Sequence, residues 1–113
     1  QYESDIDNIV LGIETITPIG LIVNELVTNV LKHAFPKVTE NSKVNIILKR
    51  SEDRLDLTIK DNGVGFTGDI KDTSFGIKLM KALGKKLKAT FNFKGVPNKG
   101  TTVTVKIKRF EVL

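Results

Sequence analysis

Glu25, Asn29 and Lys32 are polar residues whose spacing places them on one face of a helix. At 3.6 residues per turn their side chains fall within about 60° of one another, with His33 at the edge of the stripe. A carboxylate, an amide oxygen and an ammonium group there could hold hydrated Mg²⁺ and a polyphosphate, because Mg²⁺ prefers oxygen ligands and keeps several waters. The same spacing is also typical of the solvated face of an ordinary amphipathic helix.

The run DNGVGF at 61–66 directly follows a predicted strand. Its glycines, Gly63 and Gly65, let the backbone approach a flat ligand closely. Asp61, held at the end of the strand, could accept a hydrogen bond from an exocyclic amine. A plain Asp-Asn-Gly turn has the same composition, so the run by itself predicts either a base-binding loop or a simple turn.

The run SFGI at 74–77 stands at the predicted start of a second helix. Free N–H groups and the positive end of the helix dipole can bind phosphate there, and Gly76 leaves this end unobstructed. Simple N-capping by Ser74 also explains the run. A fourth feature, Gly100-Thr101, enters the last predicted strand, where a turn glycine is unremarkable by itself.

The elements that must position these motifs can be read from hydrophobic spacing. A short strand is predicted at 6–13, followed by a helix from Pro18 to about Phe35, with Thr17 as N-cap and Pro36 as the stop. Period-two alternation predicts a hairpin of strands at 43–50 and 54–60, and strands at about 89–93 and 101–109 after a helix at about 75–87. This order predicts an α+β fold: a two-layer α/β sandwich with a mixed, mostly antiparallel sheet and its helices on one face.

Composition limits the kinds of site that the chain can build. With 113 residues, 40% hydrophobic and 27% charged, it has the make-up of one soluble globular domain. The absence of cysteine excludes thiolate metal sites and thiol nucleophiles, and the single histidine excludes a multi-histidine metal centre within the chain. No apolar run approaches the roughly 20 residues that a membrane helix needs. We also expect the domain to be cytoplasmic and to make no membrane contact of its own.

Charge is distributed unevenly along the chain, whose net charge is +5. Residues 1–75 carry 8 basic and 12 acidic side chains, whereas residues 76–113 carry 10 basic side chains against a single acidic one. A basic half can bind nucleic acid, a membrane surface or an acidic protein, and it can also be a lysine-rich solvated surface. The lysines lack the interleaved aromatic residues of single-strand binders, so no nucleic-acid partner is expected.

Together and in this order, the four features resemble the ATP-binding catalytic domain of sensor histidine kinases. That superfamily is shared with gyrase, the heat-shock chaperone ATPases and the mismatch-repair ATPases, and the resemblance covers about residues 15–109. The boxes that carry it are the asparagine box at 20–35, the glycine boxes at 61–66 and 74–80, and the closing Gly-Thr element at 100–105. The sequence ELVTNVLKHAF at 25–35 is most similar to the second histidine-kinase subfamily.

The resemblance implies a Bergerat-type fold that binds Mg-ATP, with residue roles that agree with the chemistry above. Asn29 would coordinate Mg²⁺, and Lys32 would contact phosphate, with His33 beside the nucleotide. Asp61 would recognise the adenine amine. The other residues implied at the ATP site are Gly63, Gly65, Phe66, Ser74, Phe75, Gly76, Ile77, Leu79 and Thr101.

Three features qualify the implied chemistry. Glu25 stands where many histidine kinases carry a second asparagine and where gyrase-type ATPases place their general base, so it could serve the metal shell or activate water. The only histidine, His33, lies in the ATP-binding helix, so the phosphoacceptor histidine is expected on a separate domain. Only the segment 67–73 separates the two glycine boxes, and such a short lid predicts weak ATP binding.

We therefore predict that residues 1–113 form a single ATP-binding catalytic domain of a longer, multidomain protein-histidine kinase. It would present the γ-phosphate of Mg-ATP to a histidine on a phosphoacceptor dimerisation domain, with a response regulator downstream. Two alternatives share the fold: an ATP-hydrolysing switch of the gyrase or chaperone type, and an anti-sigma serine kinase. A third is a basic binding module without catalysis.

Overall fold

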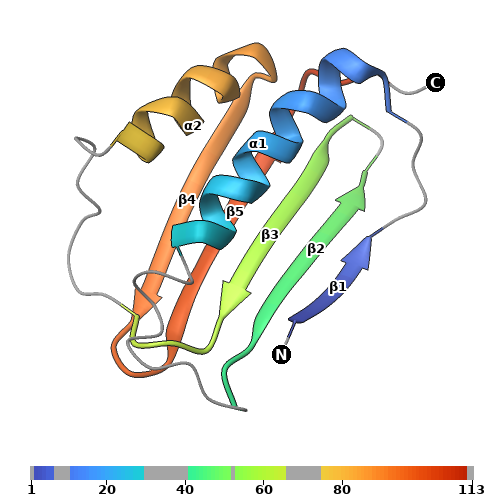
Figure 1. The fold of residues 1–113 in the computed structure, drawn as a ribbon. Helices are drawn as coiled ribbons and strands as arrows, with labels where there is room; N and C mark the ends of the chain where they lie inside the picture. The colour runs from blue at the N-terminus through green and yellow to red at the C-terminus, as the bar shows by residue number, and fades with distance from the viewer. Residues whose placement is uncertain (1, 7–10, 30–40, 52, 66–74, 112–113) are drawn as a thin grey trace.

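The computed structural model describes residues 2–6, 11–29, 41–51, 53–65 and 75–111, and the structural statements below concern these residues. Two helices lie side by side over one face of a single sheet (Figure 1). The elements in chain order are β1 (Tyr2–Ile6), α1 (Ile13–Asn29), β2 (Val44–Arg50), β3 (Leu55–Asp61), α2 (Phe75–Lys86), β4 (Ala89–Val96) and β5 (Gly100–Ile107).

The sheet has five strands in the order β1-β2-β3-β5-β4. The pairs β2–β3, β3–β5 and β5–β4 are antiparallel, whereas the edge strand β1 pairs parallel with β2. The predicted fold class, a two-layer α+β sandwich with a mixed and mostly antiparallel sheet, is confirmed.

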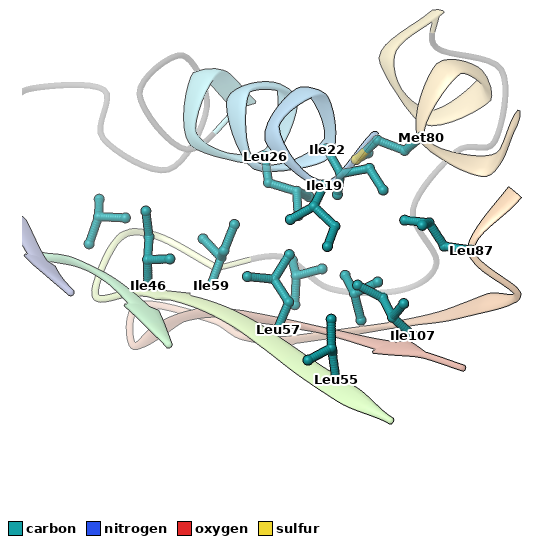
Figure 2. Packing of buried hydrophobic residues seen from close by; sticks show 13 residues of the cluster. Ile19, Ile22, Leu26, Ile46, Leu55, Leu57, Ile59, Met80, Leu87 and Ile107 are labelled. Carbon is teal, nitrogen blue, oxygen red and sulfur yellow. The ribbon is translucent and has the colours of Figure 1, made fainter. Parts of the chain in front are cut away.

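The hydrophobic core lies between the helices and the face of the sheet that they cover (Figure 2). The buried residues recur every second position in the strands and every third or fourth in α1, so each element presents one apolar face. Full burial of a valine, leucine, isoleucine or methionine side chain contributes about 1.5–3 kcal/mol to the stability of the fold. This contribution fixes the face that each element turns toward the core. The buried hydrophobic residues are Ile19, Ile22, Leu26, Val44, Ile46, Leu55, Leu57, Ile59, Met80, Leu87, Val103, Val105 and Ile107.

The first helix begins at Ile13, so the prediction of an N-cap at Thr17 and a start at Pro18 is wrong. The first turn is closed by the carbonyl of Gly12, which accepts hydrogen bonds from the amides of Thr15 and Ile16 at 3.0 and 2.9 Å. Pro18 lies inside α1, where its missing N–H leaves the carbonyl four residues earlier without its helical partner. That carbonyl belongs to an exposed residue, so water can satisfy it.

The helix start is held by the C-terminal segment of the chain. The amide of Gly12 donates to the carbonyl of Glu111 at 2.9 Å. In return the amide of Glu111 donates to the hydroxyl oxygen of Thr15, also at 2.9 Å, and Thr15 is buried. The position of the helix start therefore depends on residues at the other end of the sequence.

The first strand also differs from the prediction. It occupies Tyr2–Ile6 rather than 6–13, of which residues 7–10 lie outside the described part of the chain. β1 is an edge strand whose partners, Val44 onward, come only after α1, so its pairing is tertiary and leaves little local periodicity. The predicted hairpins and the second helix agree with β2–β3, β4–β5 and α2 within a few residues, and the predicted end of the first helix lies outside the described residues.

Candidate functional site

Asp61 is the last residue of β3, and its side chain is only 4% exposed. The alternation of β3 places it on the same face as Leu57 and Ile59, which is the face that the helices cover. α1 runs toward this end of the sheet, so its last residue, Asn29, and the end of β3 lie at the same end of the molecule (Figure 1). The fold therefore brings the predicted phosphate-binding helix and the predicted base-binding loop to one end of the sheet.

The carboxylate of Asp61 is held by two backbone amides. Gly63 N donates to Asp61 Oδ1 at 2.8 Å, and Thr101 N donates to the same oxygen at 3.3 Å. Among the described residues, both hydrogen bonds to this side chain end on Oδ1, so Oδ2 keeps its capacity to accept from a ligand. Three of the predicted residues, Asp61, Gly63 and Thr101, are thereby brought together.

The environment of Asp61 changes its acidity. Burial raises the pKa of Asp61 above the ordinary value of 3.8, because a low-dielectric surrounding disfavours the charged form. The hydrogen bonds from the amides of Gly63 and Thr101 oppose this, since they stabilise the carboxylate. A buried carboxylate that is retained by backbone donors at a strand end is a candidate for ligand recognition rather than for packing.

Two glycines let the loop 62–65 close onto the β4–β5 turn. Gly65 has φ +68°, and a Cβ added there would collide with the carbonyl of Val96. Gly100 has φ +124°, and its Cβ would collide with the carbonyl of Asp61. In this structure the missing side chain of Gly65 makes room for a neighbouring strand, a packing reason that sequence analysis did not foresee.

Asn62 was given no role in the sequence analysis, yet it makes three hydrogen bonds to the chain that enters β2. Lys43 N donates to Asn62 Oδ1 and Asn62 Nδ2 donates to the carbonyl of Asn41, each at 2.7 Å. The amide of Asn62 also donates to the carbonyl of Lys43 at 3.3 Å. No local pattern signals these contacts, since the partners lie about twenty residues earlier.

The predicted phosphate-binding residues are described only in part. Glu25 is half-buried on α1, and Asn29, four residues later, ends that helix. The side chain of Asn29 lies outside the described part of the structure, as do Lys32, His33, Phe66 and Ser74. Within the described residues no group of three or more His, Cys, Asp or Glu side chains could hold a metal ion.

The second helix begins at Phe75, which agrees with the predicted helix start at this motif. Phe75, Gly76, Ile77 and Leu79 therefore occupy its first two turns, although their side chains are not described. The middle and C-terminal part of α2 packs against the sheet. Met80 is 1% exposed, and Gly84 lies so close to Phe91 that an added Cβ would come within 2.6 Å of the ring.

A separate cavity of about 880 Å³ lies at the opposite end of the helical layer, between the start of α1, the end of α2 and the C-terminal segment. Its lining includes Pro18, Leu21, Leu83 and Phe110, and none of the predicted site residues. It is therefore not the predicted nucleotide site. In the described part of the chain, neither helix combines the length and the apolar character that crossing a bilayer requires.

The basic residues of 76–113 do not form one patch. All ten are exposed, but some lie on α2 and others on the sheet or its turns. Lys94 and Lys106, for example, alternate with inward residues and so lie on the sheet face opposite the helices. This scatter is typical of a solvated surface rather than of a binding site for a polyanion.

Comparison with known sequences shows a match to one family over nearly the whole chain. The family is described as "Histidine kinase-, DNA gyrase B-, and HSP90-like ATPase", and its profile matches residues 14–111. Over 86 residues, 75% of this chain, the sequence is 37% identical to the Sensor protein VraS of Staphylococcus epidermidis and 36% identical to that of Staphylococcus aureus. The chain spans only 23% of the length of these relatives.

Solved structures show the same architecture. The histidine kinase domain of the blue-light activated histidine kinase EL346 from Erythrobacter litoralis matches 96% of this chain and 51% of its own, with a TM-score of 0.86 and 26% identity. The mycobacterial sensor histidine kinase MprB matches 100% of this chain and 83% of its own, with a TM-score of 0.73. Its 15% identity supports similarity of fold alone.

Proposed function

Since this chain belongs to the family of histidine kinase-, DNA gyrase B- and HSP90-like ATPases, we propose that it is the ATP-binding catalytic domain of a longer sensor histidine kinase. In this role it binds ATP and presents the γ-phosphate to a histidine on a separate phosphoacceptor dimerisation domain. A response regulator then receives the phosphoryl group, and the domain works on the cytoplasmic side. The relatives named Sensor protein and the histidine kinase structures support this choice over a gyrase-type switch or an anti-sigma kinase.

The observation that carries the proposal is the buried carboxylate of Asp61, with Oδ1 occupied by two amides and Oδ2 left as an acceptor. Adenine presents an N6 amine, which is a donor, where guanine presents the O6 carbonyl, which is an acceptor. A fixed carboxylate oxygen therefore favours adenine and repels guanine. Thr101 is half-buried beside it, and we assign its side chain to support the base through a water molecule.

We assign the phosphate end of the nucleotide to the end of α1, with Lys32 and His33 beyond it, and to the start of α2. The first N–H groups of α2, at Phe75–Ile77, are donors with no helical partner and lie at the positive end of the helix dipole. Phe66, Ser74 and Leu79 complete the assigned surroundings of the nucleotide.

Mg²⁺ fits this donor set, because the amide oxygen of Asn29 is a hard ligand and Mg²⁺ retains waters and takes most of its ligands from the substrate phosphates. When bound, the ion neutralises phosphate charge. Glu25, one turn before Asn29, either supports that metal shell or orients water, and the kinase relatives favour the first role.

Isothermal titration of the isolated chain tests the proposal directly. With Mg²⁺ present we expect weak binding of ATP and of a non-hydrolysable analogue, and much weaker binding of GTP. Removal of Mg²⁺ should lower the affinity for ATP more than the affinity for adenosine, which lacks phosphates. No heat of binding at millimolar ATP would overturn the assignment of a nucleotide site.

A further inference from the structure

We propose that Asn62 is a positioning residue for the nucleotide: its side-chain amide fastens the loop 62–65 to the start of β2, and so keeps the Asp61 carboxylate turned toward its ligand. The proposal rests on the adenine-binding role of Asp61 given above. It assigns a task to a residue whose side chain bonds the chain that enters β2 rather than the carboxylate.

The side chain of Asn62 does not behave as in a simple turn. An Asn-Gly turn commonly uses the asparagine side chain on its own neighbouring backbone. Here both side-chain bonds span long sequence distances, 19 residues to Lys43 N and 21 residues to the carbonyl of Asn41. With the bond from Asn62 N to the Lys43 carbonyl, they extend the β2–β3 pairing one residue beyond the Val44–Asp61 pair.

The other end of the loop is fastened independently. Asn98 N donates to the carbonyl of Val64 at 2.7 Å, and Gly65 packs against the carbonyl of Val96. The loop is thus anchored on β2 at one end and on the β4–β5 turn at the other. Gly63 lies between the two anchors, and its amide is the donor to Asp61 Oδ1 at 2.8 Å.

The orientation of the peptide between Asn62 and Gly63 decides whether this amide reaches Asp61. If the side-chain anchor is removed, that peptide can rotate, and Asp61 loses the shorter of its two hydrogen bonds. The carboxylate is then held only by Thr101 N, so Oδ2 is no longer fixed in one direction. Because Asn62 is exposed, this effect does not act through the packing of the core.

The test compares Asn62→Ala with Thr15→Val, a matched control. Thr15→Val removes another side-chain bond to a distant backbone group, the one from Glu111 N, at the other end of the molecule. For each variant we would measure the affinity for ATP and, by carbon-detected NMR without nucleotide, the titration midpoint of Asp61. We expect Asn62→Ala to bind ATP about tenfold more weakly, the loss typical of one hydrogen bond to a charged group.

The Asp61 midpoint should also rise in Asn62→Ala, because the Gly63 hydrogen bond that lowers its pKa is lost. Thr15→Val should leave the ATP affinity and the Asp61 midpoint unchanged. Asn62→Ser keeps a short polar side chain, so it should lose less ATP affinity than Asn62→Ala. It replaces Asn62→Ala in the test if that variant fails to fold. Wild-type ATP affinity and an unchanged midpoint in the Asn62 variants would overturn the proposal. If the wild-type chain bound no ATP, the proposed function would fail, and the Asp61 midpoint would still decide whether Asn62 positions the carboxylate.

Discussion

Thr101 N and Asp61 Oδ1 lie 3.3 Å apart, and this hydrogen bond joins residues 40 positions apart in the sequence. It ties the start of β5 to the end of β3 at the point where Gly100 passes close to the Asp61 carbonyl. The geometry brings the Gly-Thr pair at 100–101 and the start of the DNGVGF run together. The amide of Thr101, in the Gly-Thr pair, holds the carboxylate of Asp61, the first residue of the DNGVGF run.

Asp61→Asn should remove most of the preference for adenine. The amide that replaces the carboxylate can present a donor to guanine O6, and loss of a charge-assisted hydrogen bond costs about 1.5–3 kcal/mol, or about tenfold to a hundredfold in affinity. Titrations with ATP and GTP check this. The matched control is Asp56→Asn on the same strand, because Asp56 lies on the opposite face of the sheet beside Arg54. Equal ATP binding by wild type and Asp61→Asn would reduce Asp61 to a turn residue.

The same substitution should stabilise the domain at neutral pH. Because burial raises the pKa of Asp61, the folded state binds its proton more tightly than the unfolded chain does, and stability falls as pH rises from the ordinary value of 3.8 through the raised value. Above that range the cost of burying the charge is fully present, and Asp61→Asn removes it. Thermal melts should show a higher Tm for the variant at neutral pH, with the advantage shrinking as pH falls. A less stable variant at neutral pH would contradict the raised pKa.

Gly100→Ala and Gly20→Ala should change stability in opposite directions. At Gly100 a Cβ meets the backbone of Asp61 and φ is +124°, so we expect a loss of about 1–3 kcal/mol together with weaker ATP binding. At Gly20, on α1, nothing lies within 4 Å of the added Cβ, so alanine should gain about 0.5–1 kcal/mol from helix propensity. Urea denaturation measures both. A tolerated Gly100→Ala would mean that β5 enters the site differently.

Glu25→Gln should separate the two roles left open for this residue. If Glu25 supports the metal shell, the isolated wild-type chain releases phosphate only at background rate, and the variant loses affinity for Mg-ATP. If Glu25 activates water, wild type hydrolyses ATP and the variant is slower by about 10²–10⁴-fold, the usual contribution of a general base. We expect the first result in a phosphate-release assay. Rapid release that depends on Glu25 would favour the gyrase-type switch.

Much of the fold was predictable because its strands alternate cleanly. Leu55, Leu57 and Ile59 predict the covered face of β3, and the structure buries all three. The start of α1 was not predictable from local signals, since Thr17-Pro18 is a good helix start in isolation. The bond between Thr15 and Glu111 spans 96 residues, so the contact that sets the true start has no local signature.

The candidate site likewise has features that follow from local sequence and features that depend on distant contacts. The position of Asp61 at a strand end and the helix start at Phe75 follow from the local pattern, and the structure agrees with both. The roles of Asn62 and Gly100 depend on partners in other strands, and turn composition hides them. Local chemistry thus predicted candidate site residues, whereas tertiary pairing decides what holds the described ones in place.

Phosphoryl transfer in trans tests the central claim most directly. The isolated chain would be incubated with γ-labelled ATP and Mg²⁺, alone and with the separately produced dimerisation domain of the full-length kinase. We expect no label on the chain itself, because His33 belongs to the predicted floor of the site and in-line attack needs a nucleophile beyond the γ-phosphorus. We expect acid-labile, base-stable label on the added domain, retained with His33→Ala and lost with Asp61→Asn. Label on His33 in the isolated chain, or no transfer to the added domain by a chain that binds ATP, would contradict the account.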